Sequence, residues 1–112
     1  MYEPTNGFAC TAGPEDFTAT ADRDGKGRRR VTVKGTCSCR TPGYELKLKL
    51  APPPLIPTEI HLDLIEEAPG GTVPQVITPT DVEGTFEIGD EVKRVLITNR
   101  KVTVEIKEAA SL

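Results

Sequence analysis

Residues 44–50 read Tyr-Glu-Leu-Lys-Leu-Lys-Leu, an alternation that places apolar side chains at even positions and charged ones at odd positions. Successive side chains of a β-strand point to opposite faces of the sheet, so this stretch predicts a strand with one buried and one solvated face. The same alternation returns at 60–64 and 102–106, and more weakly at 17–21 and 31–33. The repeated pattern predicts an all-β fold.

Turn residues divide the chain into short strands, because ten Gly and ten Pro residues occur among only 112. We expect one domain over 1–112, with an irregular lead-in at 1–15 and a frayed tail at 107–112. The pattern favours an antiparallel β-sandwich of about seven to eight strands, immunoglobulin-like in architecture, with a small open β-barrel as the alternative. The expected strands are 17–21, 29 to 37 or 39, 44–50, 59–65, a short edge strand at 73–79, 81–88, 92–98 and 102–106.

The charge balance is mildly acidic, with a net charge of −3 and 28% charged residues. This balance gives no reason to expect nucleic acid or an anionic membrane as a partner. The sequence has no apolar run long enough to span a bilayer, and residues 1–7 lack the basic and apolar regions of a signal peptide. We therefore expect a cytoplasmic protein without a membrane partner.

Three cysteines offer the main alternative chemistry. Cys37 and Cys39 share one face of a strand with parallel Cβ vectors, which disfavours a bond between them. A disulfide from Cys10 to either Cys37 or Cys39 stays open, whereas the odd number of cysteines favours reduced thiols packed in the core. A zinc site would need His61 as a fourth ligand. His61 occupies an odd position of its strand, between the apolar residues 60 and 62, so we expect it on the solvated face. We predict no metal and no cofactor, with a metal or redox-linked site on the three cysteines as the alternative function.

A run of basic residues surrounds the strand that begins at residue 29. Its outward cations share one face, and two lysines of the 44–50 strand could lie beside them. Such a face could bind an anion or a nucleic acid, but it lacks the exposed aromatic residues that stack on bases. Carboxylates of the 59–67 segment could instead neutralise it, and we favour that interpretation. The candidate anion-binding residues are Arg28, Arg30, Lys34, Lys47 and Lys49.

Catalytic residue types are scarce in this chain. His61 is the single histidine, and the two serines, Ser38 and Ser111, lie in no recognisable nucleophile motif. Isolated carboxylates on solvated strand faces are usually only hydrated. We therefore predict no catalytic residues and a protein that is not an enzyme.

Two apolar segments near prolines are the candidate partner-binding surface. Residues 52–57 cannot form a regular strand, and the 73–79 strand has proline at both ends. Apolar side chains exposed in such segments suit a protein partner or the addition of a strand. We predict a non-enzymatic protein–protein interaction or accessory module that binds another protein, or itself through an edge strand. The candidate contact residues are Leu55, Ile56, Val73, Val76 and Ile77.

Overall fold

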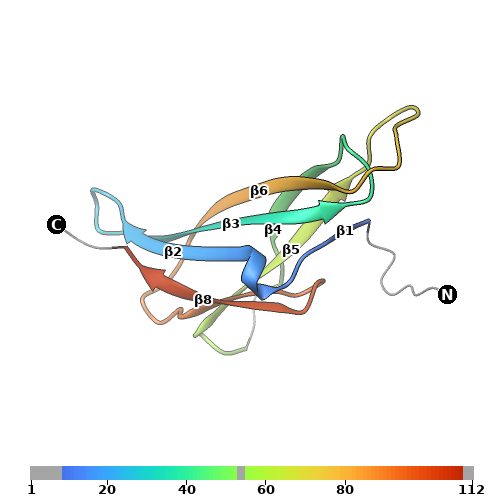
Figure 1. Cartoon of the computed structure of the whole chain (residues 1–112). Coiled ribbons are helices and arrows are strands. Elements are labelled where there is room, and N and C mark those ends of the chain that lie inside the picture. Colours follow the sequence, from blue (N-terminus) through green and yellow to red (C-terminus); the bar gives the residue numbers. More distant parts are fainter. Residues whose placement is uncertain (1–8, 53–54, 110–112) are drawn as a thin grey trace.

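The computed structural model describes residues 9–52 and 55–109, which form eight strands and one short 3-10 helix (Figure 1). The all-β prediction is confirmed. Parts of the expected lead-in (1–8), proline segment (53–54) and tail (110–112) lie outside the described residues. The elements are β1 (Cys10–Thr11), η2 (Pro14–Asp16), β2 (Phe17–Arg23), β3 (Arg29–Cys39), β4 (Glu45–Leu50), β5 (Glu59–Glu67), β6 (Thr78–Glu87), β7 (Arg94–Ile97) and β8 (Val102–Glu108).

The strands join in one open sheet with the order β6-β3-β2-β8-β7-β5-β4. The short β1 pairs with the last two residues of β3. Because β6 occupies one edge of β3 along that length, β1 lies on the other edge of β3, the edge that also pairs with β2. The β2–β8 and β5–β7 pairs are parallel, so the sheet is mixed and the prediction of an antiparallel sheet is wrong. The alternation of apolar and polar residues shows which face of a strand is buried. The same alternation occurs in parallel and antiparallel strands, so it could not predict the direction of pairing.

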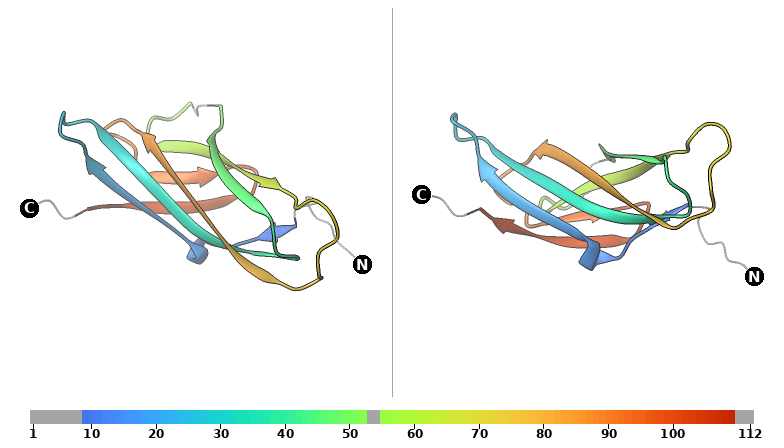
Figure 2. Two further views of the ribbon diagram at one scale, coloured as in Figure 1. Left: turned by 90° about the horizontal axis from the view of Figure 1, so that it is seen from above. Right: turned by 45° about the horizontal axis from the view of Figure 1, so that its top comes forward.

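The sheet curls until its two end strands, β4 and β6, lie close together (Figure 2). A Cβ atom placed on Gly84 of β6 would lie 3.2 Å from Cβ of Leu48 on β4. No backbone ladder joins these two strands within the described residues, so the sheet remains open. The enclosed apolar face forms one core, whose fully buried side chains include Val31, Val33, Leu62, Leu64, Val95 and Ile97.

Strand β3 follows the predicted alternation along its whole length. Gly35 shares the buried face without a bulge and lies opposite Phe17 of β2. The Phe17 ring fills the space that a side chain at position 35 would occupy. The apolar residues of this face, all buried, are Val31, Val33, Cys37 and Cys39.

The expected edge strand at 73–79 is wrong. Residues 68–77 form a loop, and β6 begins only at Thr78, opposite Cys39. Cys39 is the last residue of β3, so the residues before Thr78 have no neighbouring strand to pair with. The β-branched residues there favour an extended chain, but a strand needs a hydrogen-bonding partner.

Both ends of the described chain are more ordered than expected. Within the lead-in, Cys10 and Thr11 form β1 and a disulfide joins Cys10 to Cys39. Within the expected tail, β8 continues to Glu108 beside β2, and the Ala109 amide donates to the Ala21 carbonyl at 2.7 Å. Pairing with a distant strand therefore holds both segments.

Two buried arginines tie the sheet together near opposite ends of β3. Arg29, at the start of β3, donates to the carbonyls of Gly89 and Val92 at 2.7 and 2.9 Å and pairs with Glu108. Arg100 donates to the Cys10 carbonyl and pairs with Glu66 at 2.8 Å. Each guanidinium thus connects segments that are far apart in sequence, and its charge is matched by a carboxylate.

Candidate functional site

The structure separates the five predicted partner-binding residues into two groups. Leu55 and Ile56 lie in the loop from β4 to β5, and the other three, Val73, Val76 and Ile77, lie in the 68–77 loop. These loops lie at opposite ends of β5 (Figure 1). All are exposed except Val73, which is half-buried. The predicted residues therefore do not form one surface.

A third exposed residue, Leu50, is the last residue of β4 and immediately precedes the β4–β5 loop. Leu50 is 60% exposed, Ile56 is 48% exposed and Leu55 is fully exposed. We call these three residues the β4-end patch. The alternation predicts that Leu50 is on the buried face, but Leu50 lies at the end of the strand, next to Ala51 and Pro52, and is exposed.

An apolar pocket of about 340 Å³ lies beside the β4-end patch. It opens between the end of β4 and the segment that follows β6, so it occupies one end of the seam between the two end strands. Its lining is mainly apolar, and its polar side chains are two carboxylates and one imidazole. The lining residues are Leu50, Ala51, Glu59, Ile60, His61, Glu87, Ile88, Gly89 and Val92.

The polar groups on β5 beside this pocket are linked to one another. His61 Nε2 lies 3.0 Å from Glu59 Oε1, and Glu59 Oε2 lies 3.4 Å from Arg94. His61 was expected to face solvent; its side chain has the predicted outward parity but is only 19% exposed because Glu59 and the neighbouring strand β7 flank it. The carboxylate of Glu59 is therefore shared between an imidazole and a guanidinium, as in a structural ion-pair network.

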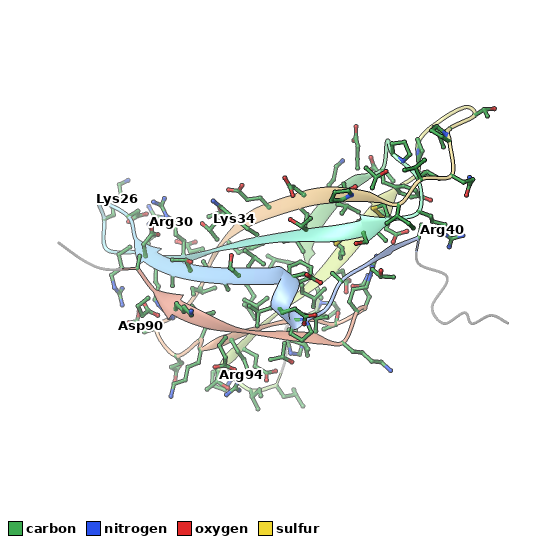
Figure 3. The ribbon with its side chains drawn as sticks, viewed as in Figure 1. Lys26, Arg30, Lys34, Arg40, Asp90 and Arg94 are labelled. Atoms are coloured by element: carbon green, nitrogen blue, oxygen red, sulfur yellow. A yellow bond between two sulfur atoms is a disulfide. The ribbon has the colours of Figure 1, made fainter. Side chains whose placement is uncertain are left out.

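The predicted basic face is not assembled. β3 is flanked by β2 and β6, and β6 lies between β3 and β4, so Lys47 and Lys49 do not adjoin the β3 cations. Figure 3 shows Lys26, Arg30 and Lys34 spread along the β2–β3 hairpin and β3. The alternating pattern could not show that β6, and not β4, would be the strand beside β3.

Carboxylates accompany the β3 cations. Arg30 pairs with Asp22 at 2.9 Å, and Arg28 lies 3.8 Å from Asp24 and 3.6 Å from Glu87. These acids come from β2, its hairpin and β6, not from the 59–67 segment considered in the sequence. Opposite charges on adjacent strands neutralise this face.

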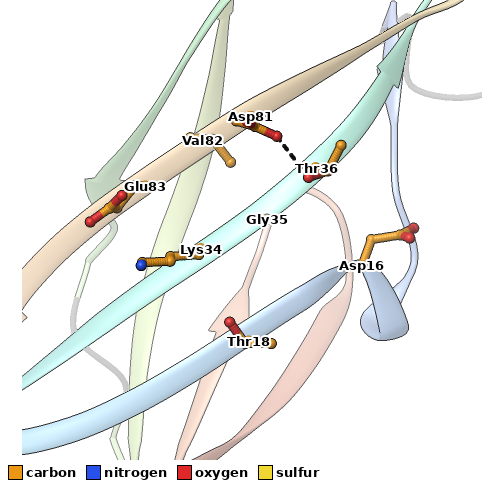
Figure 4. A pocket seen from close by; sticks show the side chains of 8 residues that line it. All are labelled: Asp16, Thr18, Lys34, Gly35, Thr36, Asp81, Val82 and Glu83. Carbon is orange, nitrogen blue, oxygen red and sulfur yellow. Dashed lines mark hydrogen bonds between the residues drawn. The ribbon is translucent and has the colours of Figure 1, made fainter.

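A polar groove of about 560 Å³ crosses the outward face of β2, β3 and β6 (Figure 4). Its lining contains one cation, Lys34, and three carboxylates, and Thr36 donates a hydrogen bond to Asp81 at 2.8 Å. The groove is rich in hydrogen-bonding groups but has no aromatic platform and an excess of negative charge. Its lining residues are Asp16, Thr18, Lys34, Gly35, Thr36, Asp81, Val82 and Glu83.

The cysteines form a structural centre in which Cys10 is bonded to Cys39 and Cys37 is free and buried. Cys39, not Cys37, is therefore the disulfide partner of Cys10. The expectation of three reduced thiols is wrong for Cys10 and Cys39. Burial raises the pKa of the Cys37 thiol above its ordinary value, although the nearby Arg100 charge acts in the opposite direction. Cys37 is therefore held as a neutral thiol. Within the described residues, no group of three or more His, Cys, Asp or Glu side chains is placed to hold a metal ion.

Comparison with models of protein families, with curated proteins and with solved structures found no match to this chain. Among the helices of residues 9–52 and 55–109, none has the length and apolar character needed to cross a membrane.

Proposed function

We propose that this protein is a non-enzymatic protein-interaction module and that the β4-end patch is its contact surface. The observation that carries the proposal is the exposure of Leu50, which lines an apolar pocket, together with the exposure of Leu55 and Ile56 in the loop that follows β4. Large apolar side chains scattered singly on a surface are ordinary, but adjacent ones beside a pocket are typical of interaction sites.

The surroundings of the patch also suit a protein partner. Glu59 and Glu87 line the pocket together with its apolar residues. An apolar centre with a polar rim is the usual composition of a protein interface. The loop that carries Leu55 and Ile56 is anchored at its far end, because the Thr58 carbonyl accepts hydrogen bonds from the amides of Lys93 and Arg94. Residues next to this anchor lose less conformational entropy on binding than residues of a free segment would.

The non-enzymatic part of the proposal rests on the arrangement of the reactive residue types. Ser38 lies on β3 and His61 lies on β5, and these strands are not neighbours in the sheet. His61 contacts a carboxylate that Arg94 also engages. We therefore interpret the Glu59 carboxylate as part of an ion-pair network, not as the partner of His61 in acid–base catalysis.

An immunoglobulin-like sandwich is the architecture that we attach to this proposal. It is supported by the division of the strands into two halves, β1, β2, β3 and β6 against β4, β5, β7 and β8, which enclose one core. The close approach of β4 and β6 also suits the alternative, a small open β-barrel.

The test compares matched pairs of exposed residues in the two loops that flank β5. Leu55→Glu with Ile56→Glu alters the β4-end patch, and Val76→Glu with Ile77→Glu makes the same change in the 68–77 loop. We expect the first double variant to lose self-association and partner capture while the second retains both. The readouts are sedimentation equilibrium and capture on immobilised protein, with circular dichroism to confirm folding. Equal binding by both double variants, or no binding by the wild-type protein, would contradict the proposal.

A further inference from the structure

We infer that the apolar pocket beside the β4-end patch binds a segment of a partner protein whose large apolar side chain is flanked by lysine or arginine. The inference rests on the proposed interaction function and names the chemistry of the partner. The pocket begins where the seam between the two end strands stops, because Leu50 is the last residue of β4 and Glu87 is the last residue of β6. Binding at this place therefore needs no free strand edge.

The size and lining of the pocket suit one large apolar side chain. Its volume of about 340 Å³ is near the lower end of the range for ligand pockets, about 300–1,000 Å³. Ile60 and Val92 of the lining are buried, whereas Leu50 is 60% exposed. The apolar lining thus runs from the core to the surface, so it offers contact to a side chain that enters from solvent.

Hydrogen bonds hold both walls of the pocket in place. On the β6 side, the buried Arg29 donates to the carbonyls of Gly89 and Val92 at 2.7 and 2.9 Å. On the β4 side, the Ala51 amide donates to the His61 carbonyl at 3.0 Å. A pocket that is already formed needs little reorganisation when a side chain enters it.

The charged side chains that line the pocket are acidic. Glu59 and Glu87 line it, and among the described residues no lysine or arginine does. Each acid has an arginine neighbour outside the lining, at 3.4 Å for Arg94 and 3.6 Å for Arg28. The Glu87 side chain is 64% exposed and that of Arg28 is 57% exposed, and such an exposed pair contributes little. An incoming cation can therefore replace Arg28 beside Glu87.

The segment that follows β6 extends this negative charge. Residues 87–93 contain three acids and one lysine. Arg23 pairs with Asp90 at 2.8 Å, whereas Glu91 has no ion-pair partner among the described residues. When an apolar side chain fills the pocket, its neighbours in the partner lie at the rim, next to these carboxylates. Complementary charge at the rim favours a basic partner and repels an acidic one.

The probes are three capped peptides with the central sequences Lys-Trp-Lys, Glu-Trp-Glu and Lys-Ser-Lys between Gly-Ser ends. The protein contains no tryptophan, so fluorescence of the peptide tryptophan reports only its own environment. We expect a blue shift and saturable binding for Lys-Trp-Lys, and binding about tenfold weaker or worse for Glu-Trp-Glu. Amide shifts in the NMR spectrum of isotope-labelled protein should be largest at Ile60, His61 and Ile88. Lys-Ser-Lys should cause none.

Two charge reversals on β6 form a matched pair of variants. Glu87→Lys changes the acid that lines the pocket, and Glu83→Lys makes the same change on the same outward face of β6, outside the pocket lining. We expect Glu87→Lys to prefer Glu-Trp-Glu over Lys-Trp-Lys, and Glu83→Lys to keep the wild-type preference. Circular dichroism confirms that both variants fold. Loss of structure cannot produce an inverted preference.

Several outcomes would overturn the inference. These are equal binding of Lys-Trp-Lys and Glu-Trp-Glu, an unchanged preference in Glu87→Lys, amide shifts located outside the pocket, and no binding of Lys-Trp-Lys at millimolar concentration. Tryptamine that binds as tightly as the Lys-Trp-Lys peptide would also overturn it, because this result indicates a site for a small amine.

The outcome for the pocket is separable from the outcome for the β4-end patch. If the double variant of Leu55 and Ile56 loses association while the peptides bind without charge preference, the patch stands and the partner chemistry is wrong. If the peptides behave as expected while that double variant still associates, the pocket stands and the patch is wrong.

Discussion

The ring of Phe17 lies directly over Gly35, its partner across the β2–β3 ladder, and a Cβ atom at position 35 would come within 2.2 Å of Phe17 Cδ1. The close approach explains why a residue without a side chain occupies the middle of the longest strand. It also joins the start of β2 to the core next to the buried cysteines of β3.

Gly35→Ala should destabilise the fold because the added methyl group must displace the buried Phe17 ring. We expect a loss of about 1–3 kcal/mol in the free energy of unfolding, the usual cost of overpacking. Urea unfolding measures it. Gly70→Ala is the control, since a Cβ atom there meets no atom within 4 Å. Phe17→Leu combined with Gly35→Ala should recover part of the loss, and equal stability of the two single variants would contradict this packing.

The Arg100–Glu66 pair should matter more than the exposed ion pairs. Glu66 also accepts hydrogen bonds from the amides of Ala9 and Cys10 at 3.1 and 2.8 Å, so it fixes β1 as well. Arg100→Leu leaves that carboxylate without its cation, and we expect a loss of about 3–5 kcal/mol in urea unfolding. Arg94→Leu removes a more exposed arginine and should cost about 0–1 kcal/mol. Similar losses for both variants would refute this ranking.

The disulfide should be visible by mass and by stability. Alkylation of the unfolded, unreduced protein should modify only Cys37, and reduction should add two further sites. Since Cys10 and Cys39 are separated by 29 positions, replacing both with Ser should cost about 3–4 kcal/mol in the free energy of unfolding through lost loop closure. Cys37→Ala serves as the control that keeps the disulfide. Three alkylated cysteines before reduction would show that the bond is absent.

Cys37 should make stability fall at alkaline pH. Its pKa is raised above 9.0 in the folded protein, mainly by burial. The folded state therefore keeps a proton that the unfolded state releases, so stability is fully present below about pH 9 and declines as pH rises from there through the raised pKa. Urea unfolding between pH 7 and pH 10 should show a steeper decline for the wild-type protein than for Cys37→Ala. Parallel pH profiles would argue against a buried neutral thiol.

Short-range patterns were sufficient to locate most strands. The alternation in 17–21, 44–50, 59–65 and 102–106 predicted β2, β4, β5 and β8, with boundaries that differ by a few residues. The pattern works because the buried face of a strand depends on its own sequence. It failed at 73–79, where the residue types favour a strand but β3 has already ended. A strand also requires a neighbour, and the local sequence does not supply one.

The candidate sites were harder to predict because they depend on which strands meet. Leu55 and Ile56 were identified from their prolines, but their separation from Val76 and Ile77 follows from the direction of the strands between them. Leu50 was missed because parity alone cannot show where the core stops covering a strand.

The sequence by itself determined the all-β class, the buried face of most strands and the apolar loop residues. Only the tertiary structure decided that β6 rather than β4 lies beside β3, that two strand pairs are parallel, that Cys39 rather than Cys37 binds Cys10, and that Arg100 meets Glu66. The physical reason is that side-chain alternation is a local property, whereas strand order, direction and register depend on contacts between segments far apart in the chain.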